Sequence, residues 1–78
     1  MNNELMNYER AKIFCNKEIK VHISKKDGIW YNGIIIEVQS DFFFIIDEED
    51  GRQLIFFKEL KSDIKEYLED EWRILWNL

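Results

Sequence analysis

Four short runs that read as β-strands, separated by tight-turn signals, constrain the fold of this chain more than any other feature. The runs cover residues 17–24, 29–39, 41–47 and 52–58. The turn signals between them are Lys26-Asp27-Gly28, Gln39-Ser40-Asp41 and Glu49-Asp50-Gly51. An Asp-Gly pair between apolar runs is a strong short-range signal for a β-hairpin. Four strands in so short a stretch leave room only for a small, strongly bent antiparallel sheet or barrel.

The apolar residues alternate along the first run and occupy both faces of the other three. In the first run, Ile19, Val21 and Ile23 share one face. A sheet that is apolar on both faces has to be covered twice. The barrel interior covers one face, so we expect helices, a neighbouring subunit or a ligand on the other. Gly33, in the middle of the second run, is expected to mark a bend or a bulge.

The sequence predicts one domain over residues 1–78, with a helix on each side of the barrel. Residues 3–15 are predicted to form the first helix, and residues 17–66 the barrel, with 62–66 as its fifth strand. Residues 67–77 fit an amphipathic C-terminal helix. An all-helical tail from residue 62 onward stays open as an alternative.

The charge of the chain restricts its partners. There are 16 Asp and Glu against 11 Lys and Arg, a net charge of −5, which argues against non-specific coating of duplex DNA. Basic residues concentrate between Arg10 and Lys26, and acidic residues dominate from Asp47 onward. The basic stretch indicates either a positive binding patch or an ordinary mixed surface, and both interpretations stay open.

The sequence shows no sign of a membrane span, a metal site or a catalytic motif. The longest uninterrupted apolar run, residues 42–46, is far too short to cross a bilayer, so we expect a cytoplasmic protein without membrane contacts. Cys15 is the one cysteine and His22 the one histidine, too few for a standard zinc site. We expect no cofactor and no enzymatic activity.

A helix followed by five short bent strands resembles the Sm-like family. In that family a first motif combines a glycine, an aspartate and an aromatic residue that stacks on a base, and Gly33, Asp41 and Phe43 match it. Ile45 stands where the family has a base-reading asparagine, which is a departure. Phe57-Lys58-Glu59 is similar in two of three positions to the Tyr-Lys-His run of bacterial Sm-like RNA chaperones. The resemblance covers residues 17–66, and SH3-like barrels of the ribosome-maturation-factor type are a second resemblance.

The resemblance implies a non-catalytic protein that binds single-stranded RNA. Small barrels hold RNA by stacking bases on aromatic rings flanked by cations. The candidate residues are Phe43, Tyr31, Trp30, Lys58, Lys25, Lys26 and Asp41. The alternative interpretation places the rings in the core or in a subunit contact, and the lysines in a solvated turn.

A second hypothesis makes the chain an acidic protein-interaction module, or a small virus- or plasmid-encoded inhibitor that mimics nucleic acid. Aromatic anchors dominate protein interfaces, and two tryptophans lie within the last seven residues. The candidate interface residues are Trp72, Leu75, Trp76 and Phe57. They either cover the outer barrel face or contact a partner protein or a second subunit of a homo-oligomer.

Overall fold

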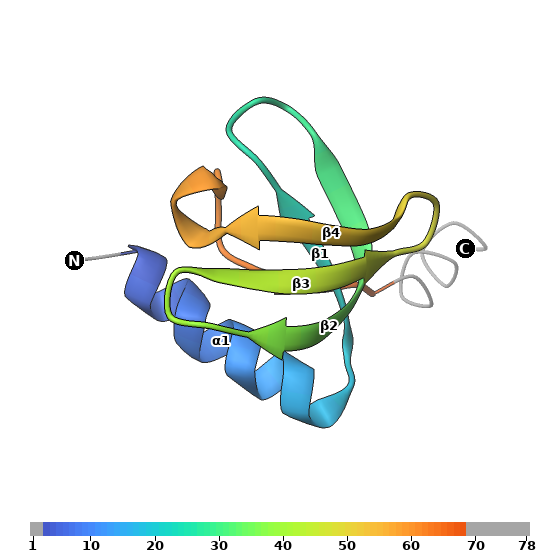
Figure 1. Cartoon of the computed structure of the whole chain (residues 1–78), viewed down its shortest axis with the longest axis horizontal. Helices are drawn as coiled ribbons and strands as arrows, with labels where there is room; N and C mark the ends of the chain where they lie inside the picture. Colours follow the sequence, from blue (N-terminus) through green and yellow to red (C-terminus); the bar gives the residue numbers. More distant parts are fainter. Residues whose placement is uncertain (1–2, 69–78) are drawn as a thin grey trace, which may run out of the picture.

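One helix and five antiparallel strands make up the part of the chain that the computed structural model describes, residues 3–68 (Figure 1). The elements are α1 (Asn3–Lys17), β1 (Lys20–Ser24), β2 (Trp30–Val38), β3 (Phe42–Asp47), β4 (Gly51–Phe56), the 3-10 helix η1 (Phe57–Glu59) and β5 (Lys65–Glu66). The predicted mostly-β fold with an N-terminal helix is confirmed. Beyond residue 68, the predicted C-terminal helix lies outside the described residues.

The strands form a single sheet in the order β4-β3-β2-β1-β5. Successive hairpins join β1 to β4, and the chain then returns through η1 so that β5 lies antiparallel to β1. Two further backbone hydrogen bonds extend the pairing between the β1 end and the segment before β5. The amide of Lys26 donates to Glu59 O, and the amide of Lys61 donates to Ser24 O, both at 2.8 Å. The outer edges of the sheet are therefore β4 and β5, which do not pair with each other within residues 3–68.

Both Asp-Gly signals mark turns, as the sequence predicts. Gly28 and Gly51 have φ angles of 91° and 75°, which glycine adopts without a steric cost. Asp27 Oδ1 accepts a hydrogen bond from the amide of Ile29 at 2.9 Å and so stabilises the first of these turns.

Gly33 serves close strand packing, and the bulge lies elsewhere. A Cβ atom at residue 33 would be 1.8 Å from the carbonyl oxygen of Ile46 on the neighbouring strand. The register between β2 and β3 shifts between Ile35 and Glu37. Of the predicted bend or bulge at Gly33, the bulge is wrong by a few residues. A residue without a side chain is needed at this position because β3 approaches so closely.

The core lies on the concave side of the sheet, under α1. Its fully buried side chains come from β1 to β4 and from the segment before β5: Val21, Ile23, Ile35, Phe43, Ile45, Ile55 and Ile64. Ala11, on the inner side of α1, completes the core. The convex face of β3 and β4 keeps apolar side chains exposed, including Ile46 (40%) and Leu54 (43%). Within residues 3–68, the second face of the sheet is thus left uncovered.

A buried asparagine links α1 to the end of the sheet. Asn7 is 2% exposed, and its Oδ1 accepts a hydrogen bond from the amide of Ile64 at 2.9 Å. Its Nδ2 donates to the carbonyl of Ser62 at 3.5 Å. A buried amide side chain is stable only when such partners are present, so Asn7 fixes the segment before β5 against the helix.

Candidate nucleic-acid interface

A cleft of about 550 Å³ opens where three distant segments of the chain meet. The first two turns of α1, the β2–β3 turn and the junction of β4 with η1 form its walls. The lining residues are Glu4, Leu5, Tyr8, Ser40, Asp41, Phe56, Phe57 and Lys58. The amide of Phe57 donates to the carbonyl of Asp41 at 2.9 Å, which fixes the turn against η1. Asp41 and Lys58, two of the predicted site residues, are thereby brought together.

Two aromatic rings of this cleft have a lysine ammonium group nearby, one from the cleft wall and one from the next turn of α1. Lys58 Nζ lies 5.8 Å from the centre of the Phe56 ring, and Lys12 Nζ lies 5.1 Å from the centre of the Tyr8 ring. Tyr8 is half-buried and meets the buried ring of Phe57 edge to face at 5.9 Å. Tyr8 and Phe56 therefore present ring surface next to cations, an arrangement that suits bases flanked by phosphates.

Two carboxylates also line the cleft and oppose a purely electrostatic attraction for phosphate. Glu4 belongs to the first turn of α1, and Asp41 to the β2–β3 turn. A carboxylate accepts hydrogen bonds and donates none when ionised. The cleft thus combines rings for stacking, the ammonium group of Lys58 for phosphate and, at Asp41, a carboxylate that can accept hydrogen bonds.

Three aromatic residues proposed as surface contacts are buried. Phe43 is 0%, Phe57 3% and Tyr31 8% exposed. The rings of Phe43 and Phe57 pack against each other, with centres 5.2 Å apart, and Tyr31 Oη donates to Gln53 Oε1 at 3.5 Å. These exposures correct two predictions, because all three rings are buried in the core. The corrected predictions are that Phe43 and Tyr31 stack on bases and that Phe57 forms an interface.

The two lysines of the β1–β2 turn differ in their surroundings. Lys25 Nζ lies 3.2 Å from Glu59 Oε2 and 3.5 Å from Asp27 Oδ2. Burial opposes its charge, but the hydrogen bond and charge of Glu59, together with Asp27, outweigh burial and raise the pKa of Lys25 above 10.5. Lys26 is exposed, and its backbone pairing places it beside η1. Lys26 is therefore the better placed of the two for contact with RNA.

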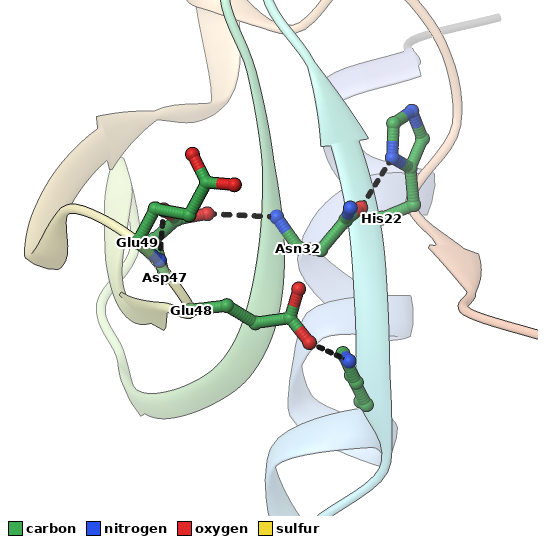
Figure 2. A network of polar contacts seen from close by, with 6 residues as sticks. His22, Asn32, Asp47, Glu48 and Glu49 are labelled. Atoms are coloured by element: carbon green, nitrogen blue, oxygen red, sulfur yellow. Dashed lines mark hydrogen bonds and ion pairs between the residues drawn. The ribbon is translucent and has the colours of Figure 1, made fainter. Parts of the chain in front are cut away.

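A separate polar network joins β1, β2 and the β3–β4 turn (Figure 2). His22 Nδ1 lies 2.6 Å from Asn32 Oδ1. The carboxylate of Asp47 accepts bonds from the amides of Asn32 (2.9 Å), Glu49 (3.0 Å) and Asp50 (2.8 Å). Burial opposes the charge of Asp47, but these amides outweigh it and lower its pKa below 3.8. Both carboxylate oxygens of Asp47 accept hydrogen bonds from backbone amides. We therefore infer that Asp47 stabilises the β3–β4 turn and does not bind a ligand.

The described residues contain no cluster of side chains suited to a metal ion. Among residues 3–68, no helix has the length and apolar character that crossing a bilayer requires.

Trp30, the remaining aromatic candidate, is 58% exposed and lies beside His22, with ring centres 5.9 Å apart. Trp72, Leu75 and Trp76 lie outside the described residues.

Sequence reasoning missed Tyr8, Phe56 and Lys12. Tyr8 and Lys12 are four residues apart and therefore share one side of α1, a spacing that is visible in the sequence. Phe56 precedes Phe57-Lys58 directly, but an unbroken apolar run does not show which of its rings faces outward.

Comparison with known proteins identifies the architecture. No family model and no curated protein matches the sequence. A solved structure that does match is the crystal structure of the pleiotropic translational regulator Hfq, with a TM-score of 0.65. The alignment covers 77% of this chain and 97% of that chain at 15% sequence identity.

The fold is Sm-like. The resemblance based on Gly33, Asp41 and the order of elements is therefore confirmed as a statement about architecture. At 15% identity, the role of individual side chains has to be argued from the cleft itself.

Proposed function

We propose that this chain is a non-catalytic, Sm-like RNA-binding protein of the cytoplasm that holds single-stranded RNA in the cleft between α1, the β2–β3 turn and η1. The observation that carries this proposal is a cleft lined by two accessible rings, Phe56 and Tyr8, each with an ammonium group close by. Lys58 belongs to the cleft wall, and Lys12 lies one turn farther along α1. The Sm-like fold, shared with a translational regulator, supports it.

Stacking supplies the sequence-tolerant part of the affinity. A base stacked on an aromatic side chain contributes about 1–3 kcal/mol, and each phosphate neutralised by a lysine adds a salt-dependent contribution. With two rings and the ammonium group of Lys58 in its wall, and Lys12 one turn away on α1, the cleft suits one or two nucleotides per chain. Avidity from several such clefts in one assembly would raise the overall affinity.

The carboxylates favour a base over a bare phosphate. Asp41 would accept a hydrogen bond from an imino or amino group of a base, whereas it repels the phosphate backbone. We therefore expect weak binding of inorganic phosphate and of duplex DNA, and stronger binding of single strands whose bases are free to enter the cleft.

The test is fluorescence anisotropy with labelled oligo-U and oligo-A over a range of salt concentrations. Lys58→Ala is expected to weaken binding and to reduce the slope of log K against log salt by about 0.7, the contribution of one contact with a single-stranded phosphate. Tyr8→Leu, which preserves apolar packing on Phe57, is expected to weaken binding about fivefold or more with the slope unchanged.

Lys17→Ala is the matched control. It removes the same charge from the last turn of α1, at the opposite end of the helix from the cleft. If Lys58→Ala and Lys17→Ala bind RNA equally, the proposed cleft is wrong. Asp41→Asn gives a check of opposite sign, because removing this carboxylate should strengthen the attraction of the cleft for phosphate.

The unpaired edges of the sheet support a homo-oligomer. An exposed edge strand is a template for pairing with another chain, and β4 and β5 are both edges within residues 3–68. Leu54 of β4 adds exposed apolar surface beside that edge (43%). We propose that copies of the chain associate through these edges and that the exposed convex face contributes to the contact.

An acidic protein-interaction module is the second candidate function. The net charge of −5 and the two acids in the cleft favour a basic protein partner over a polyanion. The same titrations distinguish the two functions, because a parent protein that binds neither oligonucleotide at low salt would favour the protein partner.

A further inference from the structure

The outward side of α1 carries a shallow apolar groove that has no part in the proposed RNA cleft, apart from its shared wall at Leu5. Figure 1 shows α1 lying along one side of the sheet, with its far side turned away from the strands. The groove is lined by six residues of this one helix: Leu5, Met6, Glu9, Arg10, Ile13 and Phe14. Leu5, Met6 and Ile13 are exposed by 60%, 37% and 51%, which is unusual for large apolar side chains gathered on one surface.

The groove lies between two parallel ridges. Residues 5, 9 and 13 form one ridge, and residues 6, 10 and 14 form the other, each with a spacing of four. Ridges of this spacing pack into the groove of a second helix in the commonest class of helix–helix contact. The surface therefore has the shape that a second helix requires.

The pattern of the six residues is self-complementary. Apolar pairs at 5–6 and 13–14 flank the charged pair Glu9-Arg10, and the pattern is symmetric about the midpoint of that pair. A twofold axis through this midpoint places Leu5 and Met6 of one copy against Phe14 and Ile13 of the other. The same axis sets Glu9 against the other copy's Arg10, twice per pair. Twofold contacts of this kind are isologous, with the same patch on both subunits.

The charges also select the direction of pairing. In a parallel arrangement in register, Glu9 would face Glu9 and Arg10 would face Arg10, and like charges in contact are repelled. Among residues 3–68, neither side chain forms an ion pair within its own chain. Both charges are therefore available to a partner.

We propose that two copies of this chain associate through α1, with the helices antiparallel about a twofold axis between Glu9 and Arg10. A single pair of helices is a small interface, so the contact is weak by itself and is strengthened where several copies present it together. Neither Glu9 nor Arg10 lines the RNA cleft, and neither lies on a sheet edge, so substitutions at these two residues test the association without changing the cleft.

Charge reversal tests the pairing through particle mass, measured by light scattering and sedimentation over a range of protein concentrations. Glu9→Arg alone, or Arg10→Glu alone, creates two like-charge contacts per pair and is expected to raise the dissociation constant about tenfold. At protein concentrations between the two dissociation constants, the weight-average particle mass then falls toward half that of the parent, whether the halved unit is a monomer or a ring. The double variant Glu9→Arg/Arg10→Glu restores opposite charges and is expected to recover the parent mass.

Lys61→Glu is the control for the change in net charge of Arg10→Glu, because Lys61 is exposed and lines neither the groove nor the cleft. It is expected to keep the parent mass. The proposal is overturned if both single reversals keep the parent mass, which would leave the groove to a different occupant. It is also overturned if the double variant dissociates as the single variants do.

Cross-linking gives a second, geometric test. In a Cys15→Ser background, Met6→Cys and Ile13→Cys place thiols at positions that face each other across the axis. A mixture of the two variants is expected to form intermolecular disulfides faster than either variant alone. Equal rates for the mixture and for the separate variants would contradict the antiparallel alignment.

Discussion

At Gly33 the backbones of β2 and β3 approach so closely that no side chain fits between them. A Cβ atom there would lie 1.8 Å from Ile46 O, far inside van der Waals contact, and this neighbour is backbone that cannot rotate away. We expect Gly33→Ala to destabilise the protein by more than about 3 kcal/mol, because the ladder between β2 and β3 has to move. Urea unfolding followed by tryptophan fluorescence measures this loss.

Gly28→Ala is the comparison for that prediction. No atom lies within 4 Å of a Cβ at Gly28, so its cost comes only from its φ of 91° and should be about 1–2 kcal/mol. A Gly33→Ala protein as stable as Gly28→Ala would show that β3 can retreat without cost.

Sequence reasoning identifies Gly33 as special but selects the wrong ring from the run Phe42-Phe43-Phe44. When consecutive residues are all apolar, alternation does not tell which of them points inward. Here Phe43 and Ile45 are buried, whereas Phe42, Phe44 and Ile46 are not. The phase is set by the pairing of β3 with β2 and β4, which is information from outside the run.

At the scale of elements, the β3–β4 hairpin depends on one carboxylate. The folded pKa of Asp47 lies below 3.8, so its contribution to stability is present above that value and is lost as the pH falls through the folded pKa. We expect Asp47→Asn to cost about 1–3 kcal/mol near pH 7, because an amide group cannot accept all three backbone bonds. The difference in unfolding free energy between parent and variant should shrink as the pH falls below 3.8 and through the lower folded pKa.

Asp50→Asn is the matched control in the same turn, because its carboxylate makes none of these three bonds. A difference between parent and Asp47→Asn that stays constant from neutral to acidic pH would contradict the assignment. The acidic run 47–50 forms a hairpin turn, as its sequence indicates. Asp47 itself is buried (8% exposed), which a run of four acids does not reveal.

At the scale of the whole molecule, the uncovered edges and convex face have a testable consequence. We expect Leu54→Lys to weaken self-association through β4 about tenfold or more, since it places a charge in a contact that would otherwise be apolar. The fold should persist, because Leu54 is 43% exposed. Light scattering should show a smaller particle than the parent at equal concentration.

Ile29→Lys controls for the change from an apolar to a basic residue at a site away from β4, where Ile29 is 47% exposed. If Leu54→Lys and Ile29→Lys form particles of equal mass, the face of β4 has no part in assembly. The charge reversals on α1 reduce the particle mass through a different contact. The effects of the two sets of variants on the free energy of association should therefore be additive.

The overall architecture can be predicted from local signals because hairpins are local. Turn residues and strand runs lie next to each other in sequence, and each Asp-Gly pair forms a turn where the sequence predicts one. The cleft cannot be predicted in the same way, because its walls come from three segments that meet only in the folded sheet. These segments are residues 4–8, 40–41 and 56–58. Tyr8 becomes part of the cleft wall because its ring packs on Phe57 of η1, about fifty residues away in sequence.

The bond between Asn7 and Ile64 has a consequence for the order in which the protein is made. A ribosome completes α1 early, but the buried amide of Asn7 finds its partner only when residue 64 has left the exit tunnel. Until then the inner side of the helix relies on apolar contacts such as those of Ala11 and of Tyr8 with Phe57, and the buried amide of Asn7 has no partner from the segment before β5. The attachment of α1 to this end of the sheet should therefore be a late step, timed by translation of β5.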